Sequence, residues 1–177
     1  MVQRDRLSYR TLQWLVAAFA LLHNLEEAVT MPSFAPLMRE HLSGFAPSGL
    51  LAATEHLAWF YIALIVATLV PFFVVLVAVK KPASRAAAWA VVLVQSIFLV
   101  NVFAPHVPAA LVLRGYAPGV VTALALQLPF SVLFLRRSVR EGAVSKAGVA
   151  LALGLALPAL VLLLGTLYFV VGKAASN

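Results

Sequence analysis

The sequence predicts an all-α membrane protein, a polytopic bundle of about five transmembrane helices. Its residues are 63% hydrophobic and only 11% charged, and its mean hydropathy is +1.01. A soluble domain of 177 residues needs far more polar surface than this. Since about twenty apolar residues cross the hydrocarbon core as one helix, residues 1–177 are expected to form a single transmembrane domain.

The apolar runs along the chain define the expected spans. The first run follows a basic tail and has no small-residue cleavage site behind it, so we interpret it as a retained helix rather than a signal peptide. The connection after it is polar and contains prolines, and is expected to hold a short interfacial helix over residues 35–42. The third span is expected to stop at Pro105 and Pro108. The five predicted spans are residues 11–29, 54–79, 86–103, 118–135 and 149–171.

Lysine and arginine alternate between the two sides of this predicted bundle. From the N-terminal tail to the C-terminal tail, the six segments outside the spans contain 3, 1, 3, 1, 4 and 1 of them. Positive residues accumulate on the cytoplasmic side, so we predict an inner-membrane protein with its N-terminus inside and its C-terminus outside. This topology accounts for the net charge of +7 without a nucleic-acid partner, and the sequence has no phosphate-binding loop, zinc-finger spacing or RNA-binding signature. It also has no cysteine, which excludes disulfides.

Polar side chains collect at the other, outer ends of the predicted spans. An ionised group within a span costs about 2.5–3.5 kcal/mol at the helix centre, and such groups normally face the bundle interior or a water-filled cavity. We therefore expect a polar pocket that opens toward the outer leaflet. The residues are His23, Glu26 and Glu27 in the first span, Glu55 and His56 in the second, Asn101 and His106 at the end of the third, and Arg114 and Tyr116 before the fourth.

The string HNLEE carries the strongest chemical signal. His23 lies three residues before Glu26 and four before Glu27, so on a helix either carboxyl group can meet the imidazole. The two glutamates point about 100° apart, so only one is expected to face His23, and the spacing does not decide which. An imidazole beside carboxyl groups suits proton transfer or metal binding.

Structural roles compete with functional ones at several of these positions. Glu55 follows Thr54, a good helix cap, and favours the positive end of a helix dipole. Asn101 could bond a neighbouring helix. Arg114 could anchor in lipid headgroups or bind an anionic group of a substrate, and Tyr116 fits the interfacial aromatic belt.

The order of motifs resembles a known family. HNLEE, an EH pair, NVFAPH and RGYAPGVVTALALQLP follow one another between residues 23 and 130. This order resembles the HXXEE family of small bacterial membrane proteins, which is defined by its motifs and not by an assigned activity. The resemblance implies no reaction. It implies that the signature positions are His23, Glu26, Glu27, Asn101, His106, Tyr116, Pro118 and Gly119.

The first functional hypothesis is a membrane-embedded enzyme that uses acid–base chemistry on a lipophilic small molecule. One glutamate of HNLEE would transfer a proton, and His23 or His106 would complete the relay. Asn101 or Tyr116 would orient the substrate. Isomerisation, cyclisation, hydration and epoxide opening all fit, and none of them requires a cofactor motif, which the sequence lacks. The predicted substrate-binding residues are Glu55, His56, Arg114 and Tyr116.

Two alternatives stay open. One is a metal-dependent hydrolase or oxidase, because the polar residues include ligand types used by zinc and non-haem iron. The other is a transporter or a membrane protein that binds a lipophilic ligand, although the absence of an inverted repeat argues against alternating access. The expected partners are the bilayer and a lipophilic substrate, and the sequence leaves the oligomeric state open. The metal ligands, under the first alternative, would be His23, Glu27, His56 and His106.

Overall fold

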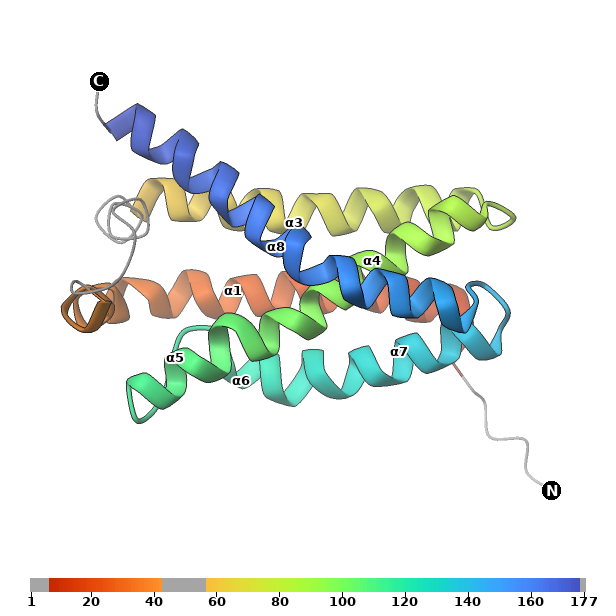
Figure 1. The fold of residues 1–177 in the computed structure, drawn as a ribbon, viewed down its shortest axis with the longest axis horizontal. Coiled ribbons are helices and arrows are strands. Elements are labelled where there is room, and N and C mark those ends of the chain that lie inside the picture. Colours follow the sequence, from red (N-terminus) through yellow and green to blue (C-terminus); the bar gives the residue numbers. More distant parts are fainter. Residues whose placement is uncertain (1–6, 43–56, 176–177) are drawn as a thin grey trace.

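The computed structural model describes residues 7–42 and 57–175 of the protein. Within these two ranges the chain forms helices and no strand, which confirms the predicted all-α fold (Figure 1). A kinked segment, Val102–His106, and a π-helical turn, Ala123–Gln127, join consecutive helices. The helices are α1 (Tyr9–Leu42), α3 (Leu57–Lys80), α4 (Arg85–Asn101), α5 (Val107–Val112), α6 (Val120–Thr122), α7 (Leu128–Arg140) and α8 (Lys146–Ala175).

Four helical segments are long and apolar enough to cross a membrane. They are Phe60–Lys80, Arg85–Val112, Val120–Arg140 and Lys146–Thr166, and they match the second to fifth predicted spans. Helix α1 contains the first predicted span and has 34 residues, but it is not among the four. We attribute this to the polar side chains of HNLEE, which interrupt its apolar run. The direction of the termini relative to the membrane stays a prediction.

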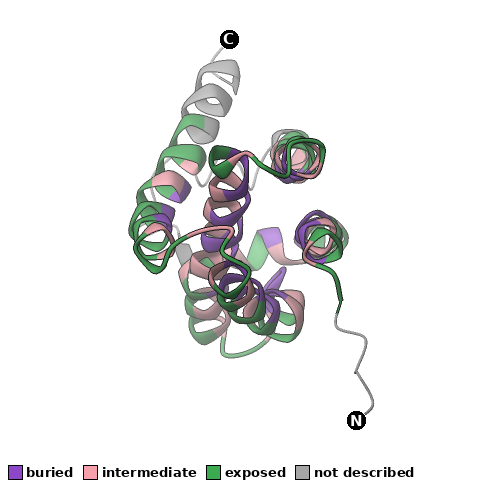
Figure 2. Ribbon diagram, turned by 90° about the vertical axis from the view of Figure 1, so that its right-hand side faces the viewer, coloured by how far each residue is buried: buried purple, intermediate pink, exposed green. Residues whose placement is uncertain are grey.

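Helix α4 is the centre of the bundle. It contacts α1, α3, α7 and α8, and its residues Val91 and Val92 are fully buried. The core continues into α3 through Val75 and into α7 through Phe134. Figure 2 shows buried residues where the helices turn toward one another and exposed residues on their outer faces. This arrangement buries one face of each surrounding helix and leaves the other open.

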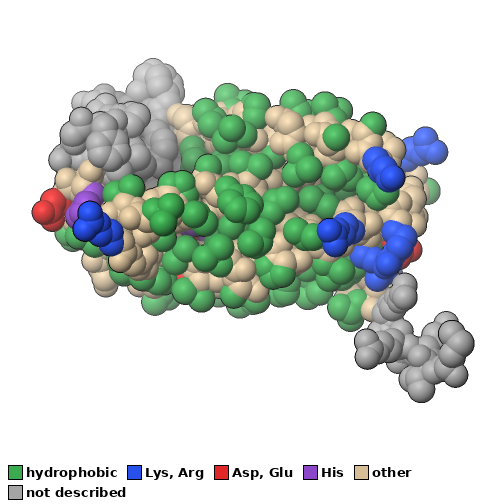
Figure 3. Space-filling view, turned by 60° about the horizontal axis from the view of Figure 1, so that its bottom comes forward, with side chains coloured by type: hydrophobic (Ala, Val, Ile, Leu, Met, Phe, Trp, Pro, Cys, Tyr) green, Lys and Arg blue, Asp and Glu red, His purple; other side chains and the backbone are tan. Residues whose placement is uncertain are grey.

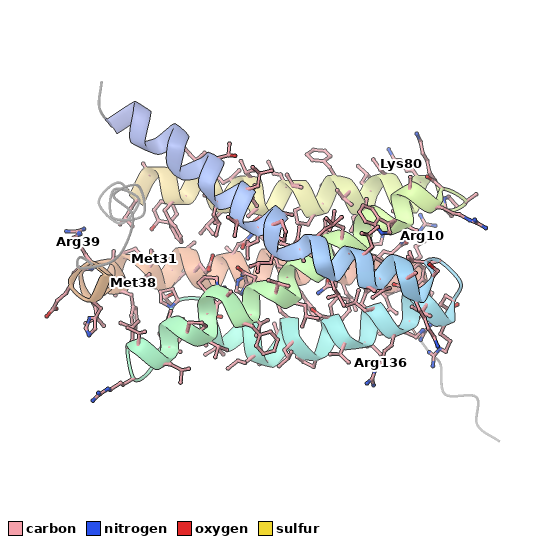
Figure 4. The ribbon with its side chains drawn as sticks, in the orientation of Figure 1. Arg10, Met31, Met38, Arg39, Lys80 and Arg136 are labelled. Atoms are coloured by element: carbon pink, nitrogen blue, oxygen red, sulfur yellow. The ribbon has the colours of Figure 1, made fainter. Side chains whose placement is uncertain are left out.

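The outer faces are apolar, and the basic residues lie at the ends. Large side chains such as Leu111, Val161 and Leu162 are exposed, and Figure 3 shows hydrophobic side chains covering the length of the bundle. Arg10, Lys80 and Arg136 lie together at one end, and Arg39 lies at the other (Figure 4). An apolar belt between two polar ends is the surface that a bilayer requires.

Helix α1 continues to Leu42 through Pro32 and Pro36. The prediction of a span that ends near residue 29 and a separate helix over residues 35–42 is therefore wrong in its boundaries. In Figure 1 the last turns of α1 leave the axis of its longer part, a bend for which proline is the usual cause. Pro32 has no N–H for the carbonyl of Ala28. The Tyr61 hydroxyl of α3 donates to that carbonyl instead, at 3.2 Å.

Tyr61→Phe is expected to lower the free energy of unfolding by about 0.5–1.5 kcal/mol, the net value of one hydrogen bond. The expected loss disappears in a Pro32→Ala background, because the alanine supplies a backbone N–H to the same carbonyl. Thermal unfolding of the four proteins of this double-mutant cycle in detergent measures the coupling. Equal losses from Tyr61→Phe in both backgrounds would show that the tyrosine does not replace the missing donor.

Candidate active site

Four side chains from distant segments converge on one point, and we call them the imidazole cluster: His23, Glu27, Asn101 and His106. Glu27 Oε1 lies 3.4 Å from His106 Nε2 and 3.8 Å from His23 Nε2. Asn101 Nδ2 lies between the two rings, 2.8 Å from His106 Nε2 and 3.4 Å from His23 Nε2. The rings meet edge to face, with centroids 4.7 Å apart. Two imidazoles, a carboxyl group and an amide thus share one small volume.

A break in the helix after Asn101 places His106 in the cluster. Ala104 has an extended backbone (φ −154°, ψ 99°) inside the turn Val102–His106, and helical structure resumes in α5. The third predicted span was expected to stop at residue 103, but the apolar segment continues to Val112. The prolines therefore interrupt the span locally without ending it. Irregular backbone at membrane depth is tolerated where it is buried in protein or lines a cavity.

The hydrogen bonds of the outer ring nitrogens fix the tautomers of both histidines. His106 Nδ1 lies 3.0 Å from the carbonyl of Pro118, which can only accept, so this nitrogen carries the proton. His23 Nδ1 lies 2.9 Å from Thr122 Oγ1, and the Thr122 hydroxyl donates to Glu26 Oε2. His23 Nδ1 therefore donates as well. In the neutral form of each ring, Nε2 then keeps a lone pair that faces the cluster, where Asn101 Nδ2 can donate toward both atoms.

Glu26 points away from the imidazoles and holds the segment that closes the cluster. Its carboxylate accepts hydrogen bonds from Tyr116 Oη (2.7 Å), Val121 N (3.2 Å), Thr122 N (2.7 Å) and Thr122 Oγ1. Four donors around two oxygens is the arrangement of an ionised carboxylate. Of the two glutamates that the sequence left undecided, Glu27 faces the imidazoles and Glu26 binds the start of α6.

Tyr116 follows the apolar segment that ends at Val112 and precedes the one that begins at Val120. Burial is the main effect that raises the pKa of its phenol. The Glu26 carboxylate beside it raises this pKa further, because a nearby negative charge disfavours a phenolate. The hydroxyl is therefore protonated at neutral pH and donates to Glu26.

Gly119 packs directly against the imidazole cluster. Its φ of +79° favours glycine, and a Cβ atom there would lie 2.7 Å from His106 Cε1 and 2.9 Å from both Glu27 Cγ and His23 Cε1. These separations are shorter than real Cβ contacts. The position thus requires glycine for its backbone conformation and for its contact with three cluster side chains.

Exposure differs within the cluster. The side chains of His23 and His106 are only 2% and 4% exposed, whereas Glu27 is 16% exposed. The Glu27 side chain is therefore the least buried of these three side chains.

The other predicted site residues have different positions. Arg114 is exposed in the turn after α5 and has a positive φ of 50°, so its role in binding a substrate stays a prediction. Glu55 and His56, including the predicted role of His56 as a metal ligand, lie outside the described residues. Sequence reasoning missed Thr122, which links His23 to Glu26. Its only signal was a hydroxyl residue in the first turn after the glycine that precedes α6.

A surface hollow of about 560 Å³ lies elsewhere, at the end of the bundle that carries the basic residues. Its lining includes Arg85, Trp89, Val139 and Gly148. These residues bring no pair of proton-transfer groups together. We assign the candidate active site to the imidazole cluster because the reactive side chains converge there.

The comparisons with known proteins agree with these motifs. Residues 14–134 match a family model described as "Protein of unknown function with HXXEE motif". The chain belongs to the HXXEE family. The match includes the whole imidazole cluster, Glu26 and the segment that Glu26 binds, so this HXXEE protein builds its candidate site within the region that defines the family.

A curated relative of the chain is likewise without an assigned function. The HXXEE chain is 30% identical over 114 residues to the uncharacterized protein YrkK of Bacillus subtilis (strain 168), and the aligned region covers 64% of this chain and 66% of YrkK. No solved structure matches the HXXEE chain. The function must therefore be argued from the site.

Proposed function

We propose that this HXXEE protein is a multi-pass enzyme of the bacterial cytoplasmic membrane that converts a lipophilic small molecule by acid–base chemistry. The observation that supports this best is the convergence of His23, Glu27, Asn101 and His106 from separate segments. Buried polar groups of this kind inside an apolar bundle are expensive and usually functional. The proposal keeps isomerisation, cyclisation, hydration and epoxide opening as candidate reactions.

The depth of the cluster suits a lipophilic substrate. His23 follows Arg10 by 13 residues on one helix, which corresponds to about 20 Å at 1.5 Å per residue. With Arg10 at the cytoplasmic surface, the cluster would lie about two thirds of the way across a hydrocarbon core of about 30 Å. A molecule dissolved in the acyl chains reaches this depth without leaving the membrane.

The residues divide the proposed chemistry among them. The Glu27 carboxyl group belongs to the least buried titratable side chain of the cluster and can give or take a proton. The Nε2 lone pairs of His23 and His106, whose protons lie on the far side of each ring, can accept a proton from Glu27 or from the substrate. The Asn101 amide can hold an oxygen of the substrate. Glu26 positions the closing segment and does not touch the reacting atoms.

The topology is tested with single cysteine substitutions. The native chain contains no cysteine, so it gives no background labelling. His41 and Lys81 are exposed at opposite ends of the bundle. In intact cells, a membrane-impermeant maleimide is expected to label the His41→Cys variant at once and the Lys81→Cys variant only after lysis. The reverse pattern would place the cluster in the cytoplasmic half and contradict the proposed orientation.

Glu27→Gln is expected to reduce turnover by about 100- to 10,000-fold, the range typical of a lost proton-transfer group. The measurement is untargeted mass spectrometry of lipid extracts from cells that express the native protein, the variant or neither. A compound is expected to be formed only with the native protein. Because the product is a new chemical species, the result also separates conversion from transport.

The matched control is Glu141→Gln, at an exposed position beside Arg137 and outside the cluster. It is expected to give the same product as the native protein. If the Glu27→Gln variant is inserted normally and forms the product at the native level, Glu27 is not the proton-transfer group and the proposed function fails.

A further inference from the structure

We infer that the imidazole cluster binds one divalent transition-metal ion of the first row, with His23 Nε2, His106 Nε2 and a Glu27 oxygen as ligands. The inference rests on the proposed function in that it concerns the same site, and it specifies the cofactor of that site. Three arguments support it: the spacing of the ligand atoms, the fixed tautomers of the histidines and the position of Asn101.

The spacing of the ligand atoms is close to that of a metal site. One ligand atom from each of His23, Glu27 and His106 lies within 4.8 Å of the others. Bonds of about 2.0–2.2 Å in a tetrahedral zinc site place neighbouring ligand atoms about 3.2–3.6 Å apart. The separation of 3.4 Å between His106 and Glu27 already fits, and that of 3.8 Å between His23 and Glu27 requires a movement of a few tenths of an ångström. The two Nε2 atoms lie within 4.8 Å of each other, so the imidazole rings would close on the metal as it binds.

The tautomers match those of metal ligands. A histidine that binds a metal usually donates its other ring N–H to a carbonyl or a carboxylate, which orients the ring. His106 donates to the Pro118 carbonyl, and His23 donates to Thr122, whose hydroxyl donates to Glu26. Two lone pairs and a carboxyl oxygen therefore point at the same place. Such a set of electron donors is stabilised by a cation among them.

Asn101 can provide the fourth ligand. Its amide nitrogen lies between the two Nε2 atoms, and a half-turn of the amide brings its oxygen to the same position. Amide oxygens bind divalent metals as carboxylate oxygens do. A water molecule or a substrate oxygen could take this position instead, which would give the three-ligand arrangement of catalytic metal sites.

The donor set restricts both the metal and the reaction. Imidazole suits zinc, iron, nickel and copper, and carboxylate suits manganese, whereas soft thiolate ligands are excluded because the chain has no cysteine. Such a metal lowers the pKa of a bound water and polarises an oxygen of the substrate. Among the candidate reactions, this favours hydration and epoxide hydrolysis, in which the product is the substrate plus one water.

The test uses the full-length protein, purified in detergent, stripped with a chelator and titrated with Zn²⁺ or Co²⁺. One equivalent is expected to bind to the native protein, measured by calorimetry and elemental analysis. His23→Ala, His106→Ala and Glu27→Gln are each expected to weaken binding at least tenfold. The matched control is His41→Ala, because His41 is exposed near the end of the same helix as His23 and lies outside the cluster. This variant is expected to bind as the native protein does.

A second variant keeps the test decisive if the alanine variants do not fold. In His106→Cys, a thiolate replaces one imidazole, and bound Co²⁺ is expected to show a sulfur-to-cobalt charge-transfer band in the near ultraviolet. The native chain cannot produce this band. The inference would be overturned if the native protein bound none of Zn²⁺, Cu²⁺, Ni²⁺, Co²⁺, Fe²⁺ and Mn²⁺, or if the cluster variants left binding unchanged.

The outcomes separate this inference from the proposed function. If chelator-treated, metal-free protein still forms a Glu27-dependent product, the inferred metal site is wrong and the proposed enzymatic function is supported. If the protein binds one metal ion tightly but forms no lipid-soluble product, the proposed enzymatic function is wrong and the inferred metal site is supported.

Discussion

Gly119→Ala is expected to lower the free energy of unfolding by about 2–5 kcal/mol and to abolish both product formation and metal binding. A residue with a Cβ atom costs about 1–2 kcal/mol in the left-handed conformation, and overpacking adds about 1–3 kcal/mol. For a chain of this size the melting temperature falls by roughly 5–20 °C. The clash involves His23, Glu27 and His106 together, so the structure cannot relax without displacing the proposed ligands.

Gly142→Ala is the matched control. Gly142 has a similar φ of +70°, but a Cβ atom there would have no heavy atom within 4 Å beyond its own chain neighbours. Its substitution therefore includes the conformational penalty without the clash, and metal binding is expected to stay at the native level. Thermal unfolding and Zn²⁺ titration of both variants in detergent provide the comparison. Equal effects of the two substitutions would show that close contact at Gly119 is unimportant.

Glu26→Gln is expected to destabilise the protein by about 2–4 kcal/mol. The amide nitrogen of glutamine cannot accept a hydrogen bond, so two of the four donors lose their acceptor, and hydrogen bonds to a charged group contribute about 1.5–3 kcal/mol each. The summed range is about 3–6 kcal/mol, and we place the expected effect below most of it because solvent screens a carboxylate that is only half-buried. The freed donors belong to the segment that carries the Pro118 carbonyl and Gly119, so the imidazole cluster should loosen as well.

Two variants show whether this effect is specific. Tyr116→Phe removes a single donor to the same carboxylate and is expected to have less than half the effect of Glu26→Gln. Glu141→Gln changes an exposed carboxylate beside Arg137 and is expected to change the melting temperature by less than about 2 °C. A Glu26→Gln variant as stable as the Glu141→Gln variant would mean that the four hydrogen bonds contribute nothing.

The sequence predicted the helical fold because composition and hydropathy act over whole segments. The last four predicted spans correspond to helical segments long and apolar enough to cross a membrane. The boundaries of the helices were harder to predict from the sequence. Proline normally signals the end of a helix, but α1 continues through Pro32 and Pro36. Tyr61, 29 residues after Pro32, donates to the carbonyl that Pro32 leaves without a backbone donor. No local pattern contains that contact.

The candidate site was predictable in its members and not in its geometry. Spacing on one helix was enough to suggest that His23 meets a glutamate. Which glutamate it meets depends on the side from which α6 approaches α1, and this is a property of tertiary packing. Thr122 was missed for the same reason, because its two side-chain partners, His23 and Glu26, are about a hundred residues away in the sequence. The catalytic roles themselves stay predictions.

The long sequence separation of these contacts also sets an order of events during biosynthesis. Glu26 in α1 receives its last donor from Thr122, 96 residues later. At about 5–20 residues per second, α1 leaves the ribosome roughly 5–20 seconds before that partner exists. During this interval the two carboxyl groups of α1 lack the partners that the second half of the chain provides, so α1 completes its packing only when that half has been synthesised.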